Sequence, residues 1–362
     1  MLTQPMDILE QFPIRKTNAQ KQGFRNDVES YAKQLGYPCK IEKGNRGTQN
    51  IVIGDPESAK YLITAHYDTP ASIGLPNIIT PKNLFFYLLW QIFIVGLLIV
   101  LAVVVGYSVW FFTQVDRLAF LAGYIVYMAI LLLMMFGPAN KNNANDNTSG
   151  VVTVLEIVRT LPENLRSKVC FVLFDMEERG LVGSSLYRKS HKNATDNQLI
   201  LNLDCVGDGD EMVMFPTKKL KKDENIMASL DRICGHNGNK ILSLHKKGFY
   251  VYPSDQRNFP KGVGIAAFKR SKLLGLYCDK IHTKRDTTLD QTNVNRPSYH
   301  PPSTLHSLSH STLWLRSRRD EVGRVRRMQA DQQFAAQRPF FWPALHPSSC
   351  RHTFPILLYP LS

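Results

Sequence analysis

Residues 61–69 of this 362-residue chain read YLITAHYDT, an apolar run that ends in a histidine and an aspartate. The apolar residues Tyr61 to Ala65 predict a buried β-strand. Two similar runs, Val169 to Phe174 and Leu199 to Leu203, are each followed by carboxylate side chains. Ligands bind at the carboxyl ends of strands in open α/β sheets, so we expect these polar side chains to converge on one crevice.

Five side chains of types that bind metals occur in this setting along the chain. They are His66, Asp146, Glu178, Asp204 and His282. Two imidazoles and three carboxylates suit a pair of zinc ions and metal-assisted hydrolysis. Taken singly, each has an ordinary explanation, such as a polar loop around Asp146. The combination in this order favours a metal centre.

Two further acids extend the group. Glu177 directly precedes Glu178, and adjacent carboxylates repel each other unless cations or protons compensate them. One of the pair can then bind metal while its neighbour handles protons. Asp68 lies two residues after His66, where it would accept the imidazole N–H and orient the ring toward a metal. The alternatives are an acidic surface turn for the glutamates and the start of a turn for Asp68.

Two long uncharged segments interrupt the α/β pattern. The 33 residues from Asn83 to Val115 carry no charge, and neither do the 23 residues from Leu118 to Asn140. About 20 predominantly apolar residues suffice to cross a bilayer, so residues 83–137 are predicted to form a transmembrane hairpin. The alternative is a pair of helices buried in a soluble core. Buried helices of this length normally retain polar edges, and neither segment has them.

The residues that flank the hairpin favour one orientation. Lys82 and Lys141 lie at its outer ends, while the tip is neutral. The positive-inside rule therefore predicts that both ends lie in the cytoplasm. The six cysteines form no CxxC pair and no disulfide framework spacing, which agrees with a reducing compartment. The catalytic part of the chain is then expected to face the cytoplasm.

The net charge of +14 is unevenly distributed along the chain. Residues 291–362 hold nine arginines, no lysine and three acids, a net charge of +6. The other 290 residues hold 35 basic and 27 acidic side chains, a net charge of +8. Aromatic residues do not alternate with a basic stripe, so nucleic acid is not expected as a partner. The cluster of Lys218, Lys219, Lys221 and Lys222 is interpreted as a solvated loop.

Helical and strand-like segments alternate on both sides of the hairpin. This pattern is typical of a mixed sheet flanked by helices, so an α/β fold is predicted. Helices are expected over residues 14–35, 151–161, 180–190 and 224–235. Besides the three runs above, strands are expected over residues 39–42, 50–53 and 263–268.

The chain from about Asn293 onward breaks this pattern. Residues 291–362 contain half of the ten histidines and eight of the twenty prolines. Such a composition predicts disorder. A second hypothesis is that the reading frame slips near Val294; sequencing the locus tests it, and an intact frame would reject it. The expected organisation is one catalytic domain in two parts, 1–82 and 138–290, with the hairpin between them and the tail 291–362 after them.

Five sequence blocks carry the metal-binding side chains: TAHYDT (64–69), ANDNTSG (144–150), FDMEERGLVGS (174–184), NLDCVG (202–207) and IHTKRDT (281–287). Together they resemble the co-catalytic, two-zinc aminopeptidases. That family includes bacterial leucyl aminopeptidases, aminopeptidase Y and the glutamate carboxypeptidases. The resemblance covers roughly residues 1–82 and 138–290. It implies a zinc-peptidase α/β fold with a mixed central sheet, interrupted here by the hairpin.

The resemblance also implies how these side chains would share two zinc ions. Asp146 would bridge both metals. His66 and Asp204 would complete one site, and Glu178 and His282 would complete the other.

The resemblance also implies roles for two further acids, and the sequence departs from the family at other positions. Glu177 would be the general base, and Asp68 would be the partner of His66. Tyr250 or Tyr252 would help to stabilise the developing oxyanion, with a packing aromatic as the alternative for either. Gln256 stands where a histidine is common in the family, and the tail replaces the closing helix that the family leads us to expect.

The predicted function is a membrane-anchored zinc aminopeptidase with two Zn²⁺ ions, acting on peptide substrates at the cytoplasmic face of a bacterial cell membrane. One alternative is a one-zinc acyltransferase that resembles glutaminyl cyclase, which a metal count would separate. Another is a non-catalytic membrane protein on a peptidase fold. The presence of Glu177 beside all five ligands argues against it, because a binding module does not need a base beside a metal cluster.

Overall fold

The structure is a computed structural model and describes residues 2–294. Of the predicted tail, residues 291–362, only residues 291–294 are described, and the rest lies outside the described residues. The described chain forms a ten-stranded sheet in the order β1-β2-β4-β3-β5-β9-β6-β8-β7, with β10 paired to β9. The strands are β1 (Cys39–Lys43), β2 (Gln49–Ile53), β3 (Tyr61–His66), β4 (Val169–Phe174), β5 (Leu199–Leu203), β6 (Glu211–Pro216), β7 (Gly235–Asn237), β8 (Lys240–Leu244), β9 (Gly262–Ser271) and β10 (Gly275–Tyr277).

The centre of the sheet is parallel. β3 pairs with β4 on one side and with β5 on the other, and β5 continues in parallel to β9. Every residue of β3, β4 and β5 is buried. A strand buried on both faces needs apolar side chains at successive positions, which explains the near-continuous apolar runs in the sequence. β2 and β6 join this centre in antiparallel pairs, so the sheet is mixed.

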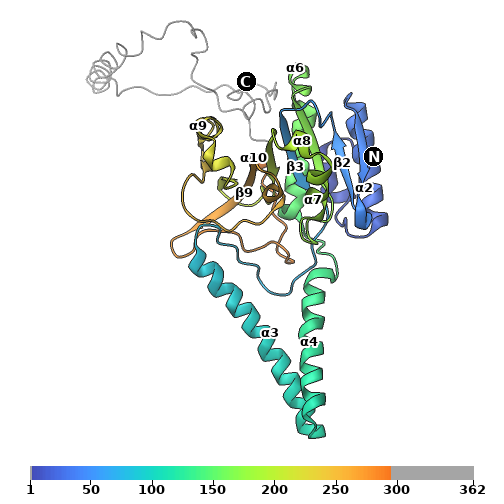
Figure 1. Ribbon diagram of the computed structural model, residues 1–362, viewed down its shortest axis with the longest axis vertical. Helices are drawn as coiled ribbons and strands as arrows, with labels where there is room; N and C mark the ends of the chain where they lie inside the picture. Colours follow the sequence, from blue (N-terminus) through green and yellow to red (C-terminus); the bar gives the residue numbers. More distant parts are fainter. Residues whose placement is uncertain (1, 295–362) are drawn as a thin grey trace, which may run out of the picture. The chain divides into compact units, whose positions relative to one another are not determined.

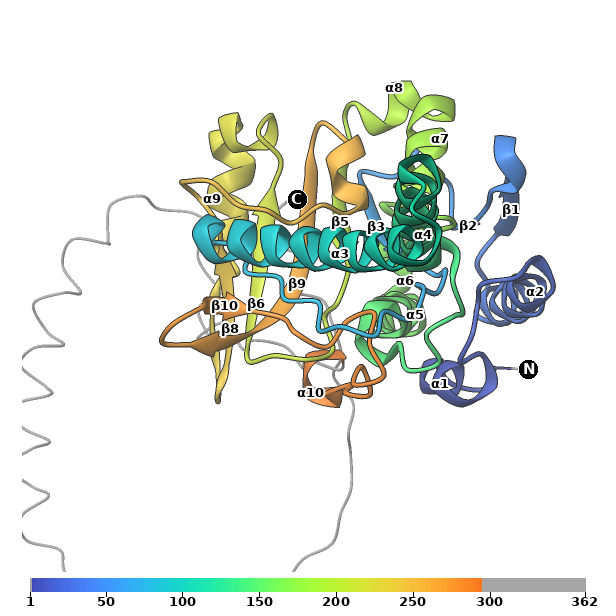
Figure 2. The same ribbon diagram turned by 90° about the horizontal axis from the view of Figure 1, so that it is seen from below.

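Helices cover both faces of the sheet (Figure 2). Successive residues of β3 point to opposite faces: Ile63 packs in a core with Phe24 of α2 (Asn18–Gln34) and Val151 of α5 (Gly150–Thr160). Leu62 packs in a second core with Tyr187 of α7 (Val182–Ser190). The other short helices are α1 (Ile8–Gln11), α6 (Glu163–Arg166), α8 (Lys192–Thr195), α9 (Glu224–Arg232) and α10 (Gln291–Val294).

Helix α2 begins at Asn18 rather than at the predicted Ile14 because of its cap. Thr17 Oγ1 accepts a hydrogen bond from Gln20 N (3.3 Å), and Gln20 Oε1 accepts one from Thr17 N (2.9 Å). This reciprocal capping box fixes the first helical turn. Residues 12–16 are not helical, and the Arg15 side chain is buried, with 0% of its surface exposed.

Two long helices, α3 (Leu84–Thr113) and α4 (Asp116–Phe136), form the hairpin. Figure 1 shows them meeting near their connecting loop and diverging toward the sheet. Both are long and apolar enough to cross a membrane, with mean hydropathies of 3.0 and 2.4. Only 6% and 0% of their most apolar windows are buried. The alternative of a helix pair enclosed in a soluble core therefore does not match the described part of the chain.

The two hairpin helices touch where glycines face each other. A Cβ added to Gly106 would lie 2.9 Å from the carbonyl oxygen of Ala119, and one added to Gly123 would lie 2.8 Å from that of Ala102. Such small-residue contacts are typical of helix pairs in lipid, where backbones approach closely.

The predicted fold class is confirmed: a mixed central sheet is flanked by helices, and the long apolar helix pair interrupts it. The helices and strands expected from the sequence all form, with ends shifted by a few residues. Four strands were not predicted, namely β6, β7, β8 and β10. β8 is partly exposed along its whole length, and β7 and β10 are only three residues long, so their sequences lack a clear burial pattern.

Candidate metal centre

Neighbouring parallel strands bring the predicted residues to one edge of the sheet. His66 is the last residue of β3 and lies opposite Phe174, the last residue of β4. Glu177 and Glu178 follow β4 after two residues, and Asp204 directly follows β5. Because β3, β4 and β5 run in parallel, all these side chains emerge at the same carboxyl-terminal edge.

Two loops complete the group. Asp146 lies in the helical turn η3 (Ala144–Ser149), which leads into α5, and His282 lies in the loop after β10. His66 Nε2 is 3.3 Å from Asp146 Oδ1 and 3.7 Å from Asp204 Oδ1. His282 Nε2 is 3.0 Å from Asp146 Oδ2 and 3.5 Å from Glu178 Oε2. The five side chains therefore converge, and the two histidines face different oxygens of Asp146.

The donor atoms form overlapping groups of three, each within 4.8 Å of one another. One group is His66, Asp146 and Asp204, and a second is Asp146, Glu178 and His282. Asp146 belongs to both of these groups. Glu177 joins a third group with His66 and Glu178 but does not share one with Asp146.

Asp68 holds the loop that carries both glutamates. Its Oδ1 accepts a hydrogen bond from the backbone N–H of Glu177 (3.0 Å), and its Oδ2 accepts one from that of Glu178 (3.2 Å). Asp68 Oδ1 also lies 3.5 Å from His66 Nδ1. This leaves His66 Nε2 facing Asp146 and Asp204, the arrangement expected when a carboxylate orients a metal-binding imidazole.

Asp286 holds the loop that carries Asp146 in the same way, through backbone hydrogen bonds. It is 1% exposed, and its carboxylate accepts hydrogen bonds from the backbone N–H groups of Asn145 (2.8 Å) and Asp146 (3.0 Å). Arg15 also supports this region. Its side chain donates to Tyr67 O (2.6 Å) and Thr148 Oγ1 (2.9 Å), which ties the end of β3 to the start of α5.

The backbone around the centre is unusual at three positions. Met176, Cys205 and His282 have φ angles of 57°, 57° and 60°, in the left-handed region that non-glycine residues seldom occupy. Met176 precedes Glu177, Cys205 follows Asp204, and His282 is itself one of the converging residues. Strained residues of this kind cluster at functional sites, where the surrounding structure enforces them.

The electrostatics of the centre fit a bound cation. Burial raises the pKa of Glu178 to about 8. Burial also raises the pKa of Glu177 well above its ordinary value, and the charge of Glu178 adds to this effect. Burial lowers the pKa of His282, but the carboxylates of Glu178 and Asp146 outweigh it and raise that pKa to about 9. Carboxylates crowded in this way are compensated by a divalent metal ion.

The donor types agree with this conclusion. Glu178 Oε1 is buried without a hydrogen-bond partner within residues 2–294. A buried carboxylate oxygen of this kind is expected to have a partner, and a metal ion provides one. Imidazole nitrogens and carboxylate oxygens are ordinary ligands of Zn²⁺. The residues present therefore fit zinc.

Residues 130–304 match the model of peptidase family M28. The matched segment begins within α4 and contains Asp146, Glu178, Asp204 and His282, while His66 lies before it. No curated protein sequence matches the chain.

Solved structures of related fold include both peptidases and cyclases. A zinc-dependent exopeptidase from Parabacteroides distasonis is 17% identical, with a TM-score of 0.50 over 80% of this chain and 91% of that one. A glutaminyl cyclase from Porphyromonas gingivalis is 16% identical, with a TM-score of 0.50 over 81% and 91%. The LapA aminopeptidase of Legionella pneumophila is 15% identical, with a TM-score of 0.49, and this chain spans 66% of its length. The similarity at such identities shows the fold alone.

The turn before β9 lies within the segment that matches family M28 and supports the strand that leads to Asp204. Gln256 lies in the 3-10 turn η5 (Asp255–Asn258) and is fully buried. Its Nε2 donates to Tyr252 O (3.1 Å), and its Oε1 accepts from Asn202 Nδ2 (3.2 Å). The residue that departs from the family pattern therefore holds β5 and η5 together and does not enter the groups of metal-binding donors.

The two tyrosines that the sequence suggested for the oxyanion are engaged elsewhere. Tyr250 OH donates to Pro216 O (2.9 Å), and Tyr252 OH donates to Asp204 O (2.8 Å). Both rings pack on Phe215, with centroids 5.0 and 5.3 Å away. The alternative of packing aromatics describes them better.

Asp255 is a candidate site residue that the sequence did not single out. It is 0% exposed, and neither carboxylate oxygen has a hydrogen-bond partner within the described chain. Burial raises its pKa to about 7, and the charge of Asp204 contributes in the same direction. The charge of Asp255 in turn raises the pKa of Glu177. The only signal in the sequence was its place in a polar turn before a strand, which many aspartates share.

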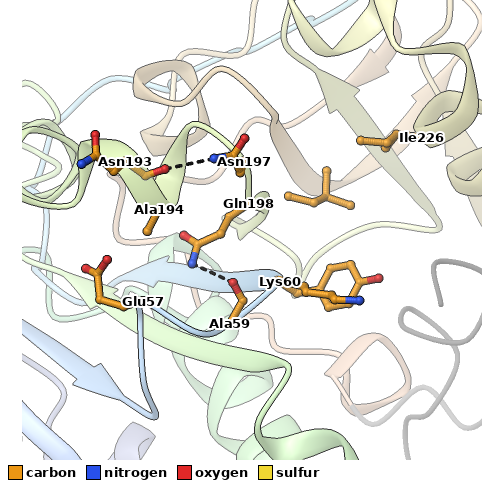
Figure 3. A pocket seen from close by; sticks show the side chains of 10 residues that line it. Glu57, Ala59, Lys60, Asn193, Ala194, Asn197, Gln198 and Ile226 are labelled. Atoms are coloured by element: carbon orange, nitrogen blue, oxygen red, sulfur yellow. Dashed lines mark hydrogen bonds between the residues drawn. The ribbon is translucent and has the colours of Figure 1, made fainter.

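A separate pocket lies at the opposite edge of the sheet (Figure 3). It has a volume of about 540 Å³ and is lined by Tyr61 and Leu199, the first residues of β3 and β5. In its wall, Gln198 Nε2 donates to Ala59 O (2.9 Å). Because β3 runs from Tyr61 to His66, this pocket is separated from the metal centre by the length of the strand and contains none of the predicted site residues.

Proposed function

We propose that this chain is a membrane-anchored, zinc-dependent peptidase that cleaves the amino-terminal peptide bond of peptide substrates. The observation that carries the proposal is the sharing of Asp146 between two groups of donors, one with His66 and Asp204 and one with Glu178 and His282. A carboxylate whose two oxygens face two separate donor sets is suited to bridge two metal ions. The match to peptidase family M28 supports the assignment.

The residues would divide the work of hydrolysis as follows. His66, Asp146, Glu178, Asp204 and His282 would hold the zinc, which would supply a Lewis acid that makes water more acidic and polarises the carbonyl of the scissile bond. Glu177 removes a proton from the water as its oxygen bonds to the carbonyl carbon. When the carbon–nitrogen bond breaks, Glu177 returns the proton to the departing amine. Asp68 keeps Glu177 in place through the backbone N–H of that residue.

Glu177 is the better candidate for the base because it belongs to fewer groups of metal-binding donors than Glu178 does. Glu178 shares a donor group with Asp146 and His282, which supports a role as a metal ligand. Glu177 lies beside the same cluster without sharing a group with Asp146. A carboxylate next to a metal pair but not bound between the metals is well placed to accept a proton.

A one-zinc acyl transfer, as in glutaminyl cyclases, is the second candidate. It is favoured by the similar fold of the Porphyromonas gingivalis enzyme. The two overlapping donor groups favour two metals and therefore hydrolysis over this alternative.

The hairpin is proposed as the membrane anchor. Both helices are exposed and apolar, and Lys82 and Lys141 flank them. The positive-inside rule supports a cytoplasmic position for these lysines and for the metal centre.

The function is tested by counting zinc in the purified full-length chain and assaying it on unblocked peptides, acyl-blocked peptides and peptides with amino-terminal glutamine. We expect two zinc ions per chain and cleavage only of peptides with a free amino terminus. One zinc ion with cyclisation of amino-terminal glutamine would establish the second candidate. Zinc binding without turnover of any peptide would favour a non-catalytic protein.

A further inference from the structure

The metal-binding candidates and the hairpin are attached to the same edge of the sheet. The candidates follow the carboxyl-terminal ends of β3, β4 and β5. From this edge the chain leaves β3 at His66 and enters α3 at Leu84. It returns from α4 at Phe136 and reaches Asp146 ten residues later. Two short connections therefore join the site to the hairpin.

Hydrogen bonds hold these two connections to each other and to a metal-binding candidate. Ser72 N, before α3, donates to Pro138 O, after α4 (2.8 Å). The next residue, Ile73, donates its N–H to His282 O (2.7 Å). The backbone of His282 is therefore one hydrogen bond away from the connection that leads to α3. This contact sets how far the site lies from the hairpin.

The end of α4 lies beside the loop that carries the glutamates. The guanidinium of Arg179 is 5.7 Å from the ring centroid of Phe136, the last residue of α4. Arg179 directly follows Glu178. The 21 residues of α4 form a helix about 32 Å long. Because the hydrocarbon core of a bilayer is about 30 Å thick, α4 needs its whole length to cross, which puts Phe136 at the membrane boundary.

The side chains around these connections suit a membrane boundary. Residues 70–81, between β3 and α3, carry no charged side chain. Leu273, in the turn between β9 and β10, is 69% exposed. The neighbouring Leu274 O accepts a hydrogen bond from Asn83 Nδ2 (3.5 Å), and Asn83 is the N-cap of α3. Because β9 runs parallel to β5, this turn lies at the edge of the metal centre. Both segments can face lipid without the cost of burying a charge.

We propose that the preferred substrates are polypeptides anchored in the same membrane, with a free amino terminus only a few residues from the bilayer surface. Six extended residues span about 20 Å, which is longer than the arginine side chain and ring contact that link the Glu178 loop to Phe136. A tethered amino terminus has its highest effective concentration when its spacer just matches the gap. The inference rests on the proposed peptidase function and membrane insertion, and it adds the class of substrate.

The test compares initial rates of release of the first amino acid by the full-length chain in liposomes. Two substrates share one amino-terminal sequence and one membrane-spanning helix and differ in a Gly/Ser spacer of about 6 or about 30 residues. The third is the amino-terminal peptide without the helix, at the same micromolar concentration. We expect the short spacer to be cleaved about tenfold faster than the long one, because effective concentration falls with about the −3/2 power of spacer length. The free peptide should be slower still.

A soluble aminopeptidase added to the same liposomes is the control. It approaches from the water, so it should cleave the long spacer at least as fast as the short one. Equal rates on the two spacers by the full-length chain, or faster cleavage of the long one, would overturn the proposal. Absence of turnover on all three substrates, the free peptide included, would reject the peptidase function and the substrate class together.

A second measurement locates the site without using turnover. The photocrosslinking amino acid p-benzoylphenylalanine is placed at Gly74, which is exposed, follows Ile73 and has no atom within 4 Å of an added Cβ. The matched position is Lys60, which is exposed and precedes β3. It lies at the opposite edge of the sheet, about 20 Å away along the strand.

After irradiation of the full-length chain in nanodiscs, mass spectrometry should find phospholipid adducts at position 74 and few or none at position 60. Adducts no more frequent at position 74 than at position 60 would place the centre away from the lipid and overturn the proposal, whatever the peptidase assay shows. Adducts at position 74 without turnover of any peptide would show instead that the peptidase function fails while the position of the site at the membrane stands.

Discussion

Asp146 is the residue on which the two groups of donors depend. Its two oxygens face different histidines, at 3.3 Å from His66 and 3.0 Å from His282. Hydrogen bonds from these histidines hold the pKa of Asp146 below its ordinary value, even though burial alone would raise it. The side chain is therefore an anion in the folded protein, as a bridging ligand must be.

This arrangement predicts that variants of Asp146 and Asp204, which share one donor group, differ in zinc content. Asp146→Ala should lose both zinc ions, because both donor groups lose a member. Asp204→Ala should lose only one, since the group of Asp146, Glu178 and His282 stays intact. Metal content after dialysis, measured by inductively coupled plasma mass spectrometry, gives the answer. Equal zinc loss in the two variants would count against a bridging role.

Glu177 gives the second prediction at this scale. Glu177→Gln keeps the shape and the backbone N–H that bonds to Asp68 but removes the proton acceptor. Turnover should fall by about 10²–10⁴-fold, the usual contribution of a general base, with zinc content unchanged. Steady-state kinetics and metal analysis on the same sample measure both quantities. The control is Glu163→Gln, which makes the same chemical change at an exposed position on α6. If the Glu177→Gln variant were as active as this control, Glu177 would not be the general base.

The connection between β4 and α7 is the element that carries both glutamates. Its geometry depends on Gly183, near the start of α7. A Cβ at this position would lie 2.1 Å from Asp175 O and 2.8 Å from Asn50 Oδ1. The helix therefore packs directly on the end of β4, which fixes where Glu177 and Glu178 emerge.

Gly183→Ala should consequently shift this connection. We expect a loss of about 1–3 kcal/mol in the free energy of unfolding, as for other overpacked sites, together with weaker zinc binding. Gly74→Ala is the matched control, because an added Cβ there meets no atom within 4 Å. Thermal unfolding and zinc titration of both variants provide the measurement. If Gly183→Ala behaves like Gly74→Ala, the close packing of α7 on β4 is not needed to position the glutamates.

The central elements were predictable because their sequences carry a strong local signal. β3, β4 and β5 are buried on both faces, so their apolar runs are nearly unbroken. Residues that support the centre from a distance carry no such signal. Asp286 contacts a loop 140 residues earlier in the chain, and Asp255 is buried beside the cluster only after β9 pairs with β5. Neighbouring residues in the sequence do not predict contacts of this range.

At the scale of the whole molecule, the hairpin joins the α/β domain at two separate points. The base of α3 is bonded to the turn between β9 and β10 through Asn83. The last residue of α4, Phe136, lies under Arg179, whose guanidinium is 5.7 Å from its ring centroid. Arg179 directly follows Glu178. The hairpin therefore contacts the loop that carries the site residues, and its two ends are held by different parts of the domain.

Replacing residues 84–136 with a flexible linker is expected to release the protein from membranes. Because the helices diverge toward the sheet, the linker needs about 20 Gly/Ser residues to connect the two ends without strain. The full-length chain should stay in the membrane pellet after alkaline carbonate extraction, as a protein with spanning helices does. The shortened chain should appear in the soluble fraction and bind zinc, because Asp68 and Asp286 hold the centre without help from the hairpin. A shortened chain that resists carbonate extraction would show that another segment anchors the protein. A soluble chain that has lost its zinc would show that contacts such as that between Arg179 and Phe136 are needed to keep the site assembled.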